Sequence, residues 1–118
     1  MTAEIRIEID DVPPSDNSVY RRNPHSMGMF MTPEGKTWKE VVRWKCPKME
    51  VLVCPIEVVI ETTFNSNRRQ DVQNRVKLTL DAMQGFIYKD DCQINKLTII
   101  KKYGQKKTVI LVRPSKIE

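Results

Sequence analysis

Two segments of strict apolar–polar alternation do most to limit what this chain can fold into. Residues 4–10 place three isoleucines on one face and charged side chains on the other, and residues 55–64 alternate in the same way. A period of two residues is typical of strands with one buried face. The chain is therefore predicted to build a sheet covered on one side. The positions predicted to face the core are Ile5, Ile7, Ile9, Ile56, Val58, Ile60, Thr62 and Phe64.

Helical signals lie between and after these strands. Thr32 is a suitable N-cap, Pro33 stands at the first helical position, and Pro47 ends the segment. A second helix is predicted over residues 72–84, with Gly85 as its stop, because its apolar side chains share one arc at 100° per residue. That arc consists of Val72, Val76, Thr79, Leu80 and Met83.

The remaining segments are predicted to be two more strands and a loop, which together with the elements above give an α+β fold. Residues 97–100 and 108–112 are apolar enough for strands, and Gly104-Gln105 between them suggests a hairpin. Residues 16–31 are predicted to be a long polar loop. The expected order is β-α-β-α-β-β, a mixed β-sheet packed by two helices, and 118 residues fit a single small domain over 1–118.

Composition excludes some function classes. His25 is the only histidine and the three cysteines are scattered, which argues against structural zinc and against a histidine-activated nucleophile. No stretch is long and apolar enough to span a bilayer, and no export signal is visible, so a cytoplasmic protein without membrane contact is expected. The net charge of +5 is compatible with nucleic acid, but the lysine-rich C-terminal part could equally be a solvated sheet edge.

Carboxylates at the two ends of the second helix could form a metal site. Asp71 directly precedes the helix, and Asp90 and Asp91 follow it in a connector. If the connector folds back along the helix, these acids converge into an oxygen-rich site for Mg²⁺, within reach of Lys77. The alternatives are a helix cap for Asp71, turn chemistry for the paired acids, and a solvated lysine that pairs with Asp81.

A resemblance to a known family helps to choose between the metal site and these structural alternatives. Residues 68–77, then 80–83, 85–86 and 90–91, resemble the core of the RusA family of Holliday junction resolvases. The segments 12–17, 20–22 and 32–35 are similar to that family's N-terminal signature. Each motif is short, but they follow the family's order over about 80 residues, and it is this shared order that makes the resemblance specific.

The resemblance implies a homodimeric, Mg²⁺-dependent endonuclease, encoded by a bacterium or a phage. It would bind branched DNA and resolve four-way junctions by paired symmetric nicks, in recombination and repair. The implied catalytic positions are Asp71, Gln73, Lys77 and Asp91. The implied metal positions are Asp71, Gln73, Asp90 and Asp91, with Asp90 in a supporting role.

Position 73 departs from the family pattern. The family places a carboxylate there, and this chain has Gln73, whose amide oxygen carries no charge and cannot act as a base. The change is expected to weaken metal binding and could abolish cleavage while sparing DNA binding. Two explanations remain open: the natural protein carries glutamine, or a glutamate was replaced by its near-isostere to trap an uncleaved complex.

Other functions are also open. DNA contacts are expected from the basic C-terminal hairpin and from Arg21, Arg22, Lys36, Arg68, Arg69, Asn74 and Arg75. The second hypothesis is a non-catalytic basic module that binds nucleic acid without chemistry. The third is a structural or partner-binding domain whose positive charge is incidental.

Overall fold

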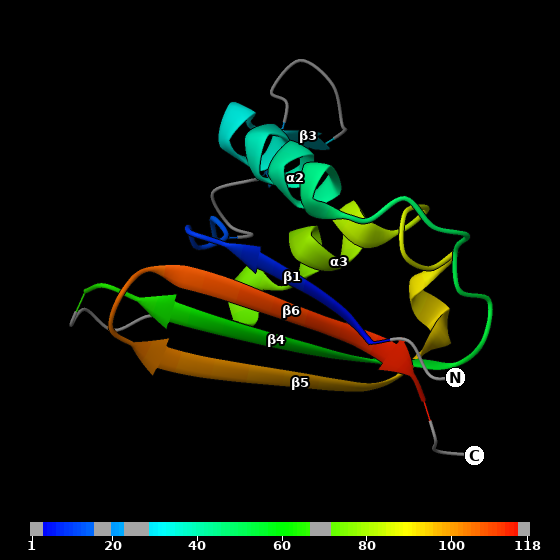
Figure 1. Cartoon of the computed structure of the whole chain (residues 1–118). Helices are drawn as coiled ribbons and strands as arrows, with labels where there is room; N and C mark the ends of the chain where they lie inside the picture. Colours follow the sequence, from blue (N-terminus) through cyan, green and yellow to red (C-terminus); the bar gives the residue numbers. More distant parts are fainter. Residues whose placement is uncertain (1–3, 16–19, 23–28, 67–71, 116–118) are drawn as a thin grey trace.

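The computed structural model describes residues 4–15, 20–22, 29–66 and 72–115. Within them a four-stranded mixed sheet has the strand order β1-β6-β4-β5. Two helices cover one face of this sheet, as Figure 1 shows, and the predicted α+β class is confirmed. The sheet strands are β1 (Ile5–Ile9), β4 (Ile56–Phe64), β5 (Ile94–Tyr103) and β6 (Lys107–Pro114), and the helices are α2 (Pro33–Lys45) and α3 (Lys77–Met83).

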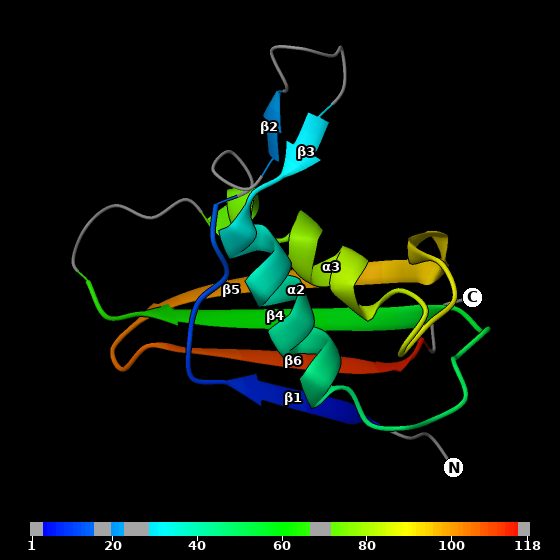
Figure 2. The same cartoon turned by 90° about the horizontal axis from the view of Figure 1, so that it is seen from above.

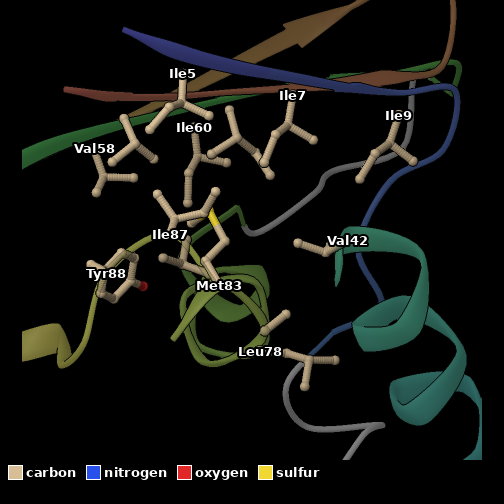
Figure 3. Packing of buried hydrophobic residues seen from close by; sticks show 14 of the residues in the cluster. Ile5, Ile7, Ile9, Val42, Val58, Ile60, Leu78, Met83, Ile87 and Tyr88 are labelled. Atoms are coloured by element: carbon tan, nitrogen blue, oxygen red, sulfur yellow. The ribbon is translucent and has the colours of Figure 1, made fainter. Parts of the chain in front are cut away.

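The alternating residues of β1 and β4 form the floor of the core. All eight positions predicted to face inward are buried, including Thr62. Figure 3 shows Ile5, Ile7 and Ile60 pointing from the sheet toward side chains of α3 and of the segment after it. Burial of these branched side chains is the main source of stability, at roughly 1.5–3 kcal/mol for each fully buried residue.

β4 is the central strand of the sheet. It pairs in parallel with β5 on one side and antiparallel with β6 on the other. The predicted hairpin at Gly104-Gln105 is therefore wrong: β5 and β6 are consecutive in the chain but flank β4 instead of pairing. The turn passes the end of β4, where the Gly104 amide donates to the Phe64 carbonyl over 2.8 Å. Because β4 is the strand whose inner face is wholly buried, pairing on both edges satisfies its backbone groups.

The first predicted helix is confirmed. α2 has Thr32 as its N-cap residue and Pro33 in its first turn, and it ends two residues before Pro47. Trp38 is buried, and its indole N–H donates to the Thr79 hydroxyl of α3 over 3.0 Å. Arg43 adds a second link, since its Nε donates to the Ala82 carbonyl over 3.1 Å. These contacts hold the two helices side by side above the sheet (Figure 2).

The second helix is not continuous as predicted. A 3₁₀ turn, η1 (Val72–Arg75), precedes α3, and Val76 separates the two. The tighter turn changes the angular phase of the residues that follow, so Leu78 and Ala82 are fully buried whereas Leu80 is only partly buried. The predicted stop is confirmed, because Gly85 has φ +87°, a conformation that favours glycine.

The segment predicted as a long loop contains a short ribbon. β2 (Tyr20–Arg22) and β3 (Met29–Met31) pair antiparallel, and in Figure 2 they project beyond the N-terminal end of α2. Strands this short give no clear alternation in the sequence, which is why the ribbon was missed. Among the described residues, no helix is long and apolar enough to cross a membrane.

The Trp38–Thr79 contact generates a stability prediction. We expect Trp38→Phe to lower the free energy of unfolding by about 1–3 kcal/mol, because it leaves the buried Thr79 hydroxyl without its indole donor and opens space in the core. The matched control is Trp44→Phe, since Trp44 is 88% exposed and should change stability by less than about 0.5 kcal/mol. Urea denaturation measures both; equal effects would show that the interhelical contact contributes little.

Candidate functional site

A hollow of about 350 Å³ lies between α3 and the edge strand β5. Its walls are apolar, but three charged side chains also line it: Lys77 and Asp81 from α3, and Asp91 from the connector before β5. Lys77 and Asp81 are four residues apart, which puts them on one side of a helix. Lys77 and Asp91 are exposed to solvent. The hollow therefore combines one cation and two carboxylates at an accessible edge of the sheet.

The connector after α3 folds back along that helix. The Ile87 amide donates to the Met83 carbonyl over 2.9 Å, and the buried Tyr88 hydroxyl donates to the Leu80 carbonyl over 2.6 Å. A second attachment joins the connector to the segment before β4, where the Leu52 amide donates to the Ile87 carbonyl over 2.8 Å. The sequence analysis required this fold-back for convergence, and with it Asp91 and Lys77 line the same hollow.

The paired acids begin a short 3₁₀ turn, η2 (Asp91–Gln93). Asp90 is its N-cap, and the Asp90 side chain accepts from the Cys92 amide over 3.0 Å. Gln93 completes a capping box, because its Oε1 accepts from the Asp90 amide over 2.8 Å. The cap therefore uses Asp90, while Asp91 lines the hollow.

The two neighbouring carboxyls have opposite pKa shifts. Hydrogen bonds from the Cys92 backbone, then from Asp91, lower the pKa of Asp90. The hydrogen bond to Asp90, some loss of solvation, and the charges of Asp90 and Asp81 raise the pKa of Asp91. Burial, with the charges of Asp91 and Asp81 added, also raises the pKa of Tyr88. Negative charge is thus concentrated around Asp91, which favours a proton or a cation there.

The carboxylate oxygens in the hollow are suitable ligands for a hard divalent cation. The described residues supply some of the ligands that such a cation needs. Carboxylate oxygens are what Mg²⁺ prefers, and repulsion between Asp91 and its acidic neighbours would be relieved by a cation. No group of three or more potential metal ligands occurs within the described ranges. Asp71 lies outside them, as does the side chain of Gln73, so their expected convergence with Asp91 stays a prediction.

The side chains of only some of the residues expected to bind DNA lie within the described part of the structure. Lys36 is exposed in the first turn of α2, and Arg21 and Arg22 lie on β2, with side chains outside the described part. Arg68, Arg69 and the side chain of Asn74 are also outside it. Arg75 contacts the protein itself: it donates to the Pro13 carbonyl over 2.5 Å and stacks 5.3 Å from the centre of the Phe64 ring.

Several basic residues near the C-terminus form ion pairs across the open face of the sheet. Lys102 pairs with Glu61 at 2.8 Å, and Lys107 pairs with Glu8 at 3.3 Å. Arg113 contacts Glu57 at 3.3 Å. Exposed pairs of this kind contribute about 0–1 kcal/mol each. Part of the basic C-terminal charge is therefore neutralised by acids of β1 and β4, as in a solvated sheet face.

Two residues of the site had no assigned role in the sequence analysis. Asp81 was considered only as a partner for Lys77, yet it lines the hollow and raises the pKa of Asp91. Its helical spacing from Lys77 was the available signal. Gln93 attaches the connector to the segment before β4, and no local pattern could have revealed this, because its partners are 39 and 41 residues away.

Comparison with models of known protein families shows which family the chain belongs to. Residues 11–113 match the family model described as endodeoxyribonuclease RusA. The chain belongs to the RusA endodeoxyribonuclease family. The match begins at Asp11 and ends at Arg113, within β6, so it includes both helices and the whole hollow of this RusA-family protein. A search of curated proteins finds no match.

Membership of the RusA family confirms the resemblance seen in the sequence. It implies an endonuclease that acts on Holliday junctions. The matched region contains the hollow in which Lys77, Asp81 and Asp91 meet. The chemistry of phosphodiester hydrolysis needs such groups to hold a cation and to stabilise developing negative charge.

The opposed pKa shifts generate a titration prediction. Asp90→Asn keeps a side-chain oxygen for the Cys92 amide but removes the charge that raises the pKa of Asp91. We expect the Asp91 pKa to fall toward the ordinary aspartate value, as measured by NMR titration of carboxyl carbons in metal-free protein. Asp81→Asn is the matched control and should lower it less, because Asp81 acts only through its charge. An Asp91 pKa that both substitutions leave unchanged would contradict this account of the site.

Proposed function

We propose that this chain is a Mg²⁺-dependent endonuclease that resolves four-way DNA junctions by paired symmetric nicks. The observation that carries the proposal is the meeting of Lys77 and Asp91 in one hollow beside Asp81. These residues come from two different elements, and only the fold-back of the connector brings them together. Family membership supplies the reaction class, and the hollow supplies the place for it.

In this proposal the acids hold the cation and the lysine acts on the phosphate. Asp71, Gln73 and Asp91 would be the metal ligands, with Asp90 orienting the connector through its cap. The bound ion would supply Lewis-acid activation of water and neutralise phosphate charge. Lys77, at the start of α3 and exposed, would stabilise the negative charge that develops on the scissile phosphate.

Gln73 sets the activity expected of this particular chain. An amide oxygen is a weaker Mg²⁺ ligand than a carboxylate, since it contributes no charge. We propose that the cation binds more weakly here than in a site with glutamate at this position, and that cleavage is reduced accordingly. A natural glutamine and an engineered replacement both fit this proposal.

DNA binding is proposed to involve the β2–β3 ribbon and the start of α2. The ribbon projects from the rest of the fold in Figure 2 and carries Arg21 and Arg22, and Lys36 lies in the adjacent first turn of α2. Arg68, Arg69 and Asn74 flank the proposed metal site in sequence. We propose that Arg75 acts mainly by holding residues 12–15 near η1, through its bond to Pro13.

A homodimer follows from the proposed reaction. Paired nicks in opposite strands of a two-fold junction need two active sites related by a two-fold axis, and a symmetric dimer provides them. Because branched DNA is formed during recombination and repair, we propose that the dimer acts in the cytoplasm of a bacterium or of a phage-infected cell.

A second candidate function is a non-catalytic module that binds branched DNA. The observation that favours it is Gln73 itself, because losing one negative ligand could leave the site unable to retain its cation. On this alternative the ribbon and the basic residues keep their proposed roles, and Lys77 and Asp91 contribute only charge to the surface.

The test is cleavage of a labelled synthetic four-way junction. We expect Gln73→Glu to raise Mg²⁺-dependent paired nicking by about tenfold or more over the unaltered chain, since one ligand regains its charge. No nicks should form without a divalent cation. If neither chain cuts any branched substrate, the enzyme proposal fails and the binding-module alternative is favoured.

Asp91→Asn in the Gln73→Glu background is the matched control for that assay. It preserves side-chain size and should reduce cleavage by about 100-fold or more, while junction affinity in metal-free buffer changes little. A mobility-shift titration at fixed salt measures the affinity. If the Asp91→Asn variant cleaves as well as its parent, Asp91 is not a metal ligand.

A further inference from the structure

The side-chain amide of Gln93 joins two segments that are distant in sequence. Its Oε1 accepts from the Lys89 amide over 2.9 Å and from the Asp90 amide over 2.8 Å. Its Nε2 donates to the Leu52 carbonyl over 2.7 Å and to the Cys54 carbonyl over 2.9 Å. The carboxamide therefore connects the backbone before Asp91 to the backbone that leads into β4.

These bonds use the whole capacity of a primary amide. A glutamine side chain has two N–H donors and an oxygen with two acceptor sites, and all four are engaged here with backbone groups. The Leu52 carbonyl also accepts from the Lys89 amide over 3.3 Å, so the two segments are linked directly as well. Glutamate, although similar in size, would place a carboxylate against two carbonyl oxygens and could not replace these donors.

The segment that receives the Gln93 amide is anchored by the central strand. The segment 52–54 leads directly into β4, whose first residue, Ile56, is fully buried. By contrast, Asp90, Asp91 and Cys92 are exposed, so little side-chain burial holds the η2 turn in place. Gln93 thus adds a direct link from the segment before the central strand to the turn that carries Asp91, which is otherwise held by buried Tyr88 before it and by β5 after it.

We propose that Gln93 is the positioning residue of the site, holding the η2 turn so that the Asp91 carboxylate faces Lys77 and Asp81 across the hollow. The inference rests on the proposed function, in which Asp91 is a metal ligand. Gln93 itself touches neither metal nor DNA in this scheme. Partners of metal ligands commonly affect metal affinity about 10–100-fold when they are removed.

The test compares two variants of the Gln73→Glu chain, in which metal binding is expected to be stronger. Gln93→Met keeps an unbranched side chain of similar length but removes all four hydrogen bonds. Trp38→Phe, on α2 and outside both the connector and the hollow, removes the buried hydrogen bond to the Thr79 hydroxyl. Mn²⁺ affinity is measured by calorimetry, and folding stability by urea denaturation.

We expect Gln93→Met to weaken Mn²⁺ binding at least tenfold, and Trp38→Phe to leave it within about twofold while also lowering stability. If Gln93 were merely structural, both variants would lose stability and both would bind Mn²⁺ as the parent does. That result would overturn the inference. If the Gln73→Glu parent itself neither binds Mn²⁺ nor cleaves a junction, the proposed function fails instead, and the two failures are distinct.

A measurement on the unaltered chain covers the case in which Gln93→Met does not fold. Amide hydrogen exchange of Asp90 should be slow, because this amide donates to the Gln93 oxygen although the residue is exposed. The Lys89 amide also donates to the Leu52 carbonyl, so its exchange does not test the connection. The Asp91 amide, in the same turn, is the internal reference and should exchange faster. Exchange of the Asp90 amide as fast as that of the Asp91 amide would contradict the connection.

Discussion

The parallel pairing of β4 with β5 is the constraint on which the rest of this structure depends. Two parallel neighbours cannot be joined by a tight turn, so the chain must cross the sheet between them, and here η1, α3 and the connector make that crossing. The crossing puts α3 over the sheet, where it completes the core. It also returns the connector along α3, and for this reason Asp91 and Lys77 line the same hollow despite their separation in sequence.

The chemistry of that hollow follows from the same arrangement. Asp81 and Asp91 approach each other closely enough for Asp81 to raise the Asp91 pKa, a state that a bound cation or proton relieves. The apolar walls, Val76, Leu80, Leu97 and Ile99, reduce solvation on one side and so strengthen the interaction of these charges with a bound ion. Under the proposed function, these repelling acids at an exposed edge would serve the phosphodiester chemistry of an endonuclease.

The parts of the fold that were predictable are those encoded by local periodicity. The alternation of Ile5, Ile7 and Ile9 gave β1, and Thr32-Pro33 gave the start of α2, because each depends on neighbouring residues. Strand order was not predictable in this way. Alternation shows which face of a strand is buried, but it does not show which strands pair with it, so the position of β4 between β5 and β6 was missed. The role of Gln93 was not predicted for the same reason, because its four hydrogen bonds to backbone groups depend on the tertiary fold. Lys77 and Asp91 were predicted as site residues through motif order, whereas Asp81 was considered only as a partner for Lys77.

The central claim is that acids from both ends of the η1–α3 segment share one cation beside Lys77. Paramagnetic broadening of NMR signals by added Mn²⁺ tests it most directly, because broadening depends on distance from the ion and requires no catalysis. The account predicts that Asp71, Lys77 and Asp91 broaden together at low Mn²⁺, ahead of the exposed acids Glu8 and Asp11, which are ion-paired with lysines at the other edge of the sheet. Broadening at Asp91 that leaves Asp71 and Lys77 sharp, or broadening spread evenly over all surface acids, would contradict it.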